Sequence, residues 1–160
     1  MKRPTILRFF LLALLFATAF GCRTAEMDGI HAARMAMANS IPSEDAGDYY
    51  IGRRYFKRDY KFWGFVRRPR EPWKSAKLVM LNEQGRLAPD RESGQLGNDN
   101  NYEYKLYGNF SGQTVYEPAS NGFYPEFVLQ RYELISASPA NIFRAPGATD
   151  PSRRIIAQPY

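Results

Sequence analysis

The chain contains one cysteine and one histidine among its 160 residues. Cys22 alone cannot form a disulfide within the chain, so the core must provide the stability of the fold. Because His31 is the only histidine, Ser-His-Asp and Cys-His catalysis would both depend on that one side chain. The chain has too few cysteines and histidines for a typical zinc site. It also contains neither of the glycine-rich phosphate-binding motifs, GxGxxG and GxxxxGK(S/T). The sequence therefore predicts a protein without a metal or other cofactor.

Carboxylate chemistry is not excluded by these absences, since glycoside hydrolysis needs only two acids at a set separation. The candidate acids are Asp90, Glu92, Asp99, Glu103, Glu117 and Glu126. Their spacing singles out no pair. We therefore expect a non-enzymatic protein with a binding or structural role, and a small carboxylate-dependent hydrolase is the alternative.

The chain also lacks an apolar run of the roughly 20 residues that a transmembrane helix needs. Its apolar segment from Phe9 to Phe20 is shorter, follows the basic residues Lys2 and Arg3, and ends at Gly21-Cys22. A basic start, a short apolar run and a small residue before a cleavage point are typical of an export signal. Residues 1–21 are therefore predicted to be a signal peptide.

The segment Ala19-Phe20-Gly21-Cys22 resembles the signal of bacterial lipoproteins. In that family the cysteine is acylated and becomes the first residue of the mature protein. The resemblance implies that Cys22 carries the lipid and that the protein is bound to membrane lipid in the cell envelope. In that family an Asp directly after the cysteine often signals retention in the inner membrane. Arg23 stands at this position here, which favours the outer membrane if the host has two membranes.

Ordinary signal cleavage is the alternative to lipidation. Ala17-Thr18-Ala19 matches the A-x-A pattern of a cleavage site. Cleavage there would release a secreted or periplasmic protein that begins at Phe20.

The rest of the chain changes pattern near Tyr49. Residues 22–48 are small and polar, which predicts a tether with one short helix from Asp28 to Ala38. Period-two alternation then predicts strands over 60–67 and 102–110, and a continuous apolar run predicts a largely buried strand over 77–83. Two further strands are predicted over 114–117 and 127–135. Short strands separated by turn residues favour an all-β domain over residues 49–136, a small barrel or sandwich with an OB-like barrel as the nearest analogue. Residues 137–160 show no periodicity, which predicts a flexible tail.

Nine basic and two acidic residues lie between Arg53 and Lys74, among several aromatic residues. In the cytosol this pattern would favour single-stranded nucleic acid, but the export signal argues against nucleic acid as a partner. We instead expect an anionic glycan, lipopolysaccharide or an envelope protein. The predicted anion-binding residues are Arg53, Arg54, Trp63, Arg67 and Arg68. A charged strand face that only keeps the barrel soluble is the alternative.

Overall fold

The computed structural model describes residues 27–160, so the predicted signal and Cys22 lie outside the described residues. The chain divides into two units, Met1–Met37 and Ala38–Tyr160. A helix covers residues 27–40, which are rich in the strong helix formers Ala and Met. This helix includes the one predicted from Asp28 to Ala38, and His31 is exposed on it. Within residues 27–160, no helix has the length and apolar character needed to cross a membrane.

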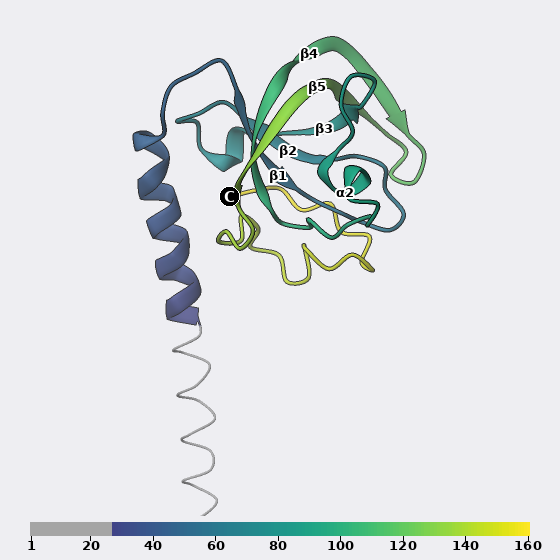
Figure 1. The fold of residues 1–160 in the computed structure, drawn as a ribbon. Helices are drawn as coiled ribbons and strands as arrows, with labels where there is room; N and C mark the ends of the chain where they lie inside the picture. Colours follow the sequence, from purple (N-terminus) through teal and green to yellow (C-terminus); the bar gives the residue numbers. More distant parts are fainter. Residues whose placement is uncertain (1–26) are drawn as a thin grey trace, which may run out of the picture. The chain divides into compact units, whose positions relative to one another are not determined.

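Residues 38–160 form a closed barrel of five strands (Figure 1). The strands are β1 (Tyr50–Arg54), β2 (Gly64–Arg67), β3 (Lys77–Asn82), β4 (Glu103–Glu117) and β5 (Gly122–Ser136). Their order around the barrel is β1-β2-β3-β5-β4, with β3 and β5 parallel and every other pair antiparallel. The short helices are η1 (Ile41–Ser43), η2 (Trp73–Ser75) and α2 (Pro89–Glu92). The predicted all-β, OB-like barrel is confirmed, with α2 between β3 and β4 in the chain.

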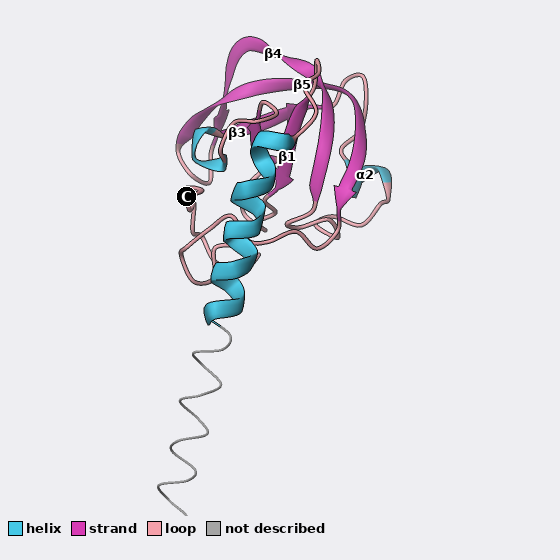
Figure 2. Ribbon diagram, turned by 90° about the vertical axis from the view of Figure 1, so that its left-hand side faces the viewer, coloured by secondary structure: helices cyan, strands magenta, loops and turns pink. Residues whose placement is uncertain are grey.

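β1 lies where the sequence predicts no strand, and β5 begins at Gly122 rather than at residue 127. β2 and β4 also begin or end elsewhere than the alternation predicts. β4 continues through Ser111 and Gly112, where the sequence predicts a turn, because a register shift between Phe110 and Thr114 absorbs these residues. The resulting hairpin of β4 and β5 is long and curved (Figure 2). β2 begins only at Gly64, where a Cβ atom would lie 2.2 Å from the carbonyl oxygen of Arg53. Glycine at this position therefore allows β1 and β2 to approach closely.

The barrel interior is filled mainly by aromatic and branched aliphatic side chains from all five strands and the residue before β2. Its buried residues are Tyr50, Trp63, Val66, Val79, Ala88, Tyr104, Leu106, Phe127 and Leu129. Trp63 is 1% exposed, so it belongs to this core and not to the surface that the sequence predicts for it.

Residues 137–160 pack against the barrel, which differs from the flexible tail that the sequence predicts. Phe143 is buried with its ring centroid 5.1 Å from that of Tyr55. The Tyr55 hydroxyl donates to the carbonyl of Ile155, and the Lys57 ammonium donates to the carbonyl of Asp150. These contacts come from isolated side chains and backbone carbonyls, so they leave no periodic pattern in the sequence. The folded unit therefore extends to Tyr160.

Candidate functional site

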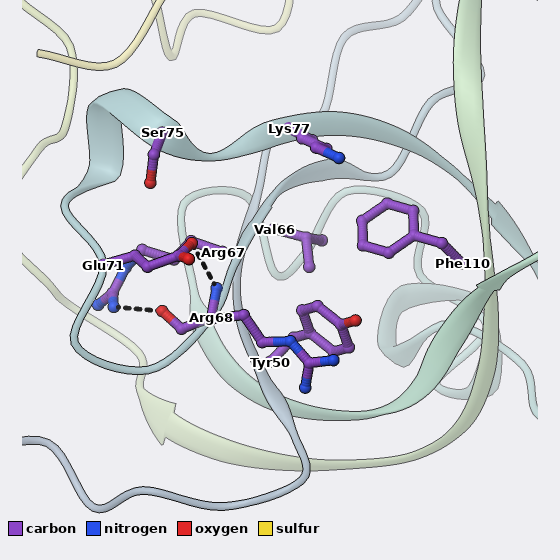
Figure 3. A pocket seen from close by; sticks show the side chains of 8 residues that line it. All are labelled: Tyr50, Val66, Arg67, Arg68, Glu71, Ser75, Lys77 and Phe110. Atoms are coloured by element: carbon purple, nitrogen blue, oxygen red, sulfur yellow. Dashed lines mark hydrogen bonds between the residues drawn. The ribbon is translucent and has the colours of Figure 1, made fainter. Parts of the chain in front are cut away.

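A hollow of about 210 Å³ opens at one end of the barrel, and we call it the mouth hollow (Figure 3). Its lining residues are Tyr50, Val66, Arg67, Arg68, Glu71, Ser75, Lys77 and Phe110. They come from the start of β1, the end of β2, the β2–β3 connection, the start of β3 and the middle of β4. Barrel mouths are among the places where ligand sites are commonly found.

The apolar wall of the mouth hollow is aromatic. The Tyr50 ring packs edge-on against Phe110, with the centroids 5.5 Å apart, and against Phe127 at 5.2 Å. Val66 is buried beside them (Figure 3). Edge-to-face packing holds aromatic rings in defined orientations. The hollow therefore has a wall made by the barrel core itself.

Two cations lie over these aromatic rings. The Arg68 guanidinium lies 3.9 Å from the Tyr50 ring centroid, and the Lys77 ammonium lies 5.2 Å from that of Phe110. Arg68 has one ion pair, a 3.4 Å contact with the fully exposed carboxylate of Asp48, and such a surface pair is worth little. Lys77 has no ion pair with an acid among residues 27–160. Both cations are therefore available to an anionic ligand.

Two more exposed cations, Arg70 and Lys74, lie on the β2–β3 connection, outside the lining of the mouth hollow. We call Arg68, Arg70, Lys74 and Lys77, which are all exposed, the basic rim. Glu71 is the acidic residue in the same stretch, so residues 68–77 carry a net charge of 4 − 1 = +3. Exposed charges of one sign beside a concave surface attract ligands of the opposite sign.

Glu44 fixes the β2–β3 connection in place. Its two carboxylate oxygens accept hydrogen bonds from Arg67 at 2.7 and 2.5 Å, a bidentate pair. The same carboxylate accepts the backbone N–H of Arg70 at 2.8 Å. Arg70 has a left-handed backbone with φ of 67°, which is uncommon for a residue other than glycine. Glu44 therefore stabilises the turn from which the basic rim extends.

The predicted anion-binding surface of Arg53, Arg54, Arg67 and Arg68 is not present as a surface. Arg53 has 0% exposure and forms an ion pair with Glu103, and its guanidinium also donates to the carbonyl of Ala140 at 2.7 Å. Arg67 is 3% exposed and is neutralised by Glu44. Both guanidiniums lie against the ring of the buried Trp73, at 5.1 and 4.5 Å from its centroid. Arg53 and Arg67 therefore make internal contacts in the domain and do not face solvent.

Arg54 is also internal and lies between two acids. Its guanidinium pairs with Asp90, and its Nε lies 3.3 Å from Asp99 Oδ1. All three side chains are nearly inaccessible to water. Burial raises the pKa of Asp99 to about 6, against the opposing effect of Arg54 and with a contribution from Asp90. Of the four predicted arginines, only Arg68 is therefore exposed.

The six candidate acids of the hydrolase hypothesis all have partners within the protein. Besides the pairs of Asp90, Asp99 and Glu103 with arginines, Glu92 pairs with Arg86. Glu117 accepts hydrogen bonds from Ser120 and the backbone of Ala119. Glu126 accepts one from Asn82 at 2.8 Å. The six carboxylates therefore take part in ion pairs and hydrogen bonds within the protein.

A second hollow, of about 220 Å³, lies at the opposite end of the barrel. Arg54, Trp63 and Leu81 line it, whereas Tyr50, Val66 and Lys77 on the same strands or next to them line the mouth hollow. Its exposed cations are Arg58, Lys61 and Arg91. Arg91 is paired with Glu83 at 3.4 Å. Arg58 and Lys61 therefore resemble Arg68 and Lys77 in charge and exposure, but they lie at the other end of β1–β3.

Comparison of the chain with protein-family models, curated proteins and solved structures finds no match.

Proposed function

We propose that this protein is a lipid-anchored protein of the cell envelope whose barrel binds an anionic ligand at the mouth hollow. The observation that carries the proposal is the contrast between two groups of arginines and lysines. Arg53, Arg54 and Arg67 are buried and neutralised by acids, whereas Arg68 and Lys77 lie beside a hollow without a strong counter-charge.

The same contrast favours binding over hydrolysis. Hydrolysis of a glycoside needs two carboxyl groups that face the substrate. Glu71, the acidic residue that lines the mouth hollow, accepts the backbone N–H of Arg68. The acids at the second hollow, Glu83 and Asp90, are paired with Arg91 and Arg54. A hollow with cations beside aromatic rings suits recognition of an anion better than acid–base chemistry.

The predicted acyl group on Cys22 would attach the protein to a membrane. Diacylglycerol together with an amide-linked chain gives more than one anchoring chain, which is enough for stable membrane attachment. The tether then joins the barrel through residues 41–48, and Glu44 and Asp48 of this segment contact the β2–β3 connection. The anchor would therefore lead into the domain beside the proposed site.

Metabolic labelling with a fatty acid tests the anchor. The parent protein should incorporate the label and fractionate with membranes, and the Cys22→Ala variant should lose the label and remain unprocessed or move to the soluble fraction. Ser40→Ala, in the helix and away from the cleavage point, is the matched control and should behave as the parent. Equal labelling of the parent and Cys22→Ala would reject the lipoprotein assignment.

A further inference from the structure

The nature of the anion follows from the chemistry of the site and from its position beside the point where the tether joins the barrel. We propose that the mouth hollow and the basic rim bind the phosphate groups of anionic lipids in the membrane that holds the protein's own anchor. This inference rests on the proposed function, because it requires a lipid at Cys22.

The tether limits how far the mouth hollow can lie from the lipid. The helix over residues 27–40 is about 21 Å long, and residues 23–26 add at most about 14 Å when fully extended. Glu44 then ties the end of the tether to Arg67 and Arg70. The mouth hollow therefore stays within a few tens of ångströms of the membrane. Confinement at this scale raises the effective concentration of headgroups, so even weak individual contacts become occupied.

The charges of the basic rim suit a layer of anionic headgroups. Four cations lie within ten residues, and each is exposed. A basic side chain near an anionic membrane surface contributes about 1 kcal/mol, which corresponds to about fivefold in affinity. Arg70 is pinned through its backbone and its Nε to Glu44, at 2.8 Å in both cases. Arg70 is thus held in place before binding, so this part of the rim loses little conformational freedom on binding.

The hollow adds a place for one headgroup. Arg68 and Lys77 lie on either side of it, and Tyr50 and Phe110 supply aromatic rings next to the cations (Figure 3). Arginine and lysine are the side chains that bind phosphate oxygens, arginine as a planar fork and lysine as a point charge. The aromatic rings offer an apolar wall for the glycerol or sugar that carries the phosphate. A phosphate ester of a small polyol therefore matches both the two cations and the aromatic wall of the hollow.

The test measures how fast lysines are acetylated in the mature, lipid-anchored protein reconstituted into vesicles. One set of vesicles is pure phosphatidylcholine, and the other contains equimolar phosphatidylglycerol. Initial rates at Lys74, Lys77 and Lys61 are read by peptide mass spectrometry. Lys61 is the internal control, because it is exposed but lines the hollow at the other end of the barrel. Flotation with the vesicles is scored separately and reports on the acyl anchor, so a failed anchor and a failed site give different results.

Phosphatidylglycerol should slow acetylation of Lys77 and Lys74 several-fold and leave Lys61 unchanged. Salt near 1 M, where the screening length is about 3 Å, should reverse the protection. Arg68→Gln, with its fold checked by circular dichroism, should weaken the protection of Lys77 by about fivefold. A third arm adds soluble glycerol phosphate to the protein in phosphatidylcholine vesicles.

The other outcomes overturn the proposal. Protection of Lys77 by glycerol phosphate but not by phosphatidylglycerol would identify a site for free phosphate esters in place of the membrane. Equal slowing of Lys61, Lys74 and Lys77 would show unspecific attraction of the whole domain to the surface. Unchanged rates in every arm would show that the hollow binds no phosphate.

Discussion

Arg53 and Glu103 are directly opposite each other on the neighbouring strands β1 and β4, and their side chains form an ion pair. The Arg53 side chain is completely buried, and Glu103 is 15% exposed. Burial lowers the pKa of Arg53, and the nearby Glu103 carboxylate opposes that effect. An acid on the adjacent strand therefore helps to keep a positive charge inside the domain.

Removing the charge of Glu103 should destabilise the barrel strongly. Glu103→Gln keeps the size of the side chain but removes the carboxylate that pairs with the buried Arg53 guanidinium. Loss of one partner of a buried pair costs about 3 kcal/mol or more, which urea unfolding can measure. The matched control is Glu133→Gln, since the Glu133–Arg131 pair is exposed on both sides and should contribute less than about 1 kcal/mol. Equal effects of the two substitutions would contradict a structural role for Arg53.

Stability should decrease as pH rises through the titration range of Asp99. Its pKa is about 6 in the folded protein against an ordinary value of 3.8. Between about pH 4 and pH 6 the folded state therefore keeps a proton that the unfolded chain has lost, so the free energy of unfolding falls with rising pH. The fall from this group is about 3 kcal/mol. Because other acids titrate in the same range, the contribution of Asp99 is isolated by comparing the unfolding free energy of the parent with that of Asp99→Asn.

Asp99→Asn places a neutral amide at the same position and should lack this contribution. The difference between the unfolding free energies of the parent and the variant should therefore change across that pH range and be flat above it. Urea titrations at several pH values give this difference directly. A constant difference from pH 4 to pH 7 would show that Asp99 has an ordinary pKa in the folded state.

Gly64→Ala should also destabilise the barrel. The added Cβ would lie 2.2 Å from the carbonyl oxygen of Arg53 and 3.0 Å from the backbone nitrogen of Tyr55. Since backbone atoms cannot move aside without disturbing the β1–β2 pairing, the cost should be about 1–3 kcal/mol. Gly29→Ala is the control, because no atom lies within 4 Å of its added Cβ. A thermal midpoint for Gly64→Ala equal to that of the parent would contradict the close approach of the two strands.

The sequence could predict β3 and parts of β2, β4 and β5, but it could predict neither β1 nor which faces of the strands are covered. The apolar run over 77–83 predicts β3, and the alternation over 102–110 predicts the first part of β4. Charged side chains are in general rarely buried, and the basic and aromatic run over 53–74 predicts a binding surface that includes Arg53 and Arg67. Their acidic partners lie 50 and 23 residues away in the sequence, and the segments that cover them, including η2 and the C-terminal tail, show no periodicity. Nothing local in the sequence therefore distinguishes a buried arginine from an exposed one.

The candidate site was predictable only in part. Arg68 was among the predicted anion-binding residues and does line the mouth hollow. Tyr50, Lys77 and Phe110 belong to three different strands, and only closure of the barrel brings them together. Their meeting point depends on strand order and register, which the alternation of side chains does not determine.

The central proposal is that the anion binds the cations of the mouth hollow rather than the equally exposed Arg58 and Lys61 at the other end of the barrel, and paired charge variants test it most directly. Arg68→Gln/Lys77→Gln and Arg58→Gln/Lys61→Gln each remove two exposed cations, one pair from each end of the barrel. The measurement is equilibrium binding of a water-soluble, short-chain phosphatidylglycerol to the purified mature protein at low salt. We predict that the mouth variant loses about 25-fold in affinity, about fivefold for each cation, and that the other variant binds as the parent does. Equal losses in both variants, or undiminished binding by the mouth variant, would contradict the proposal.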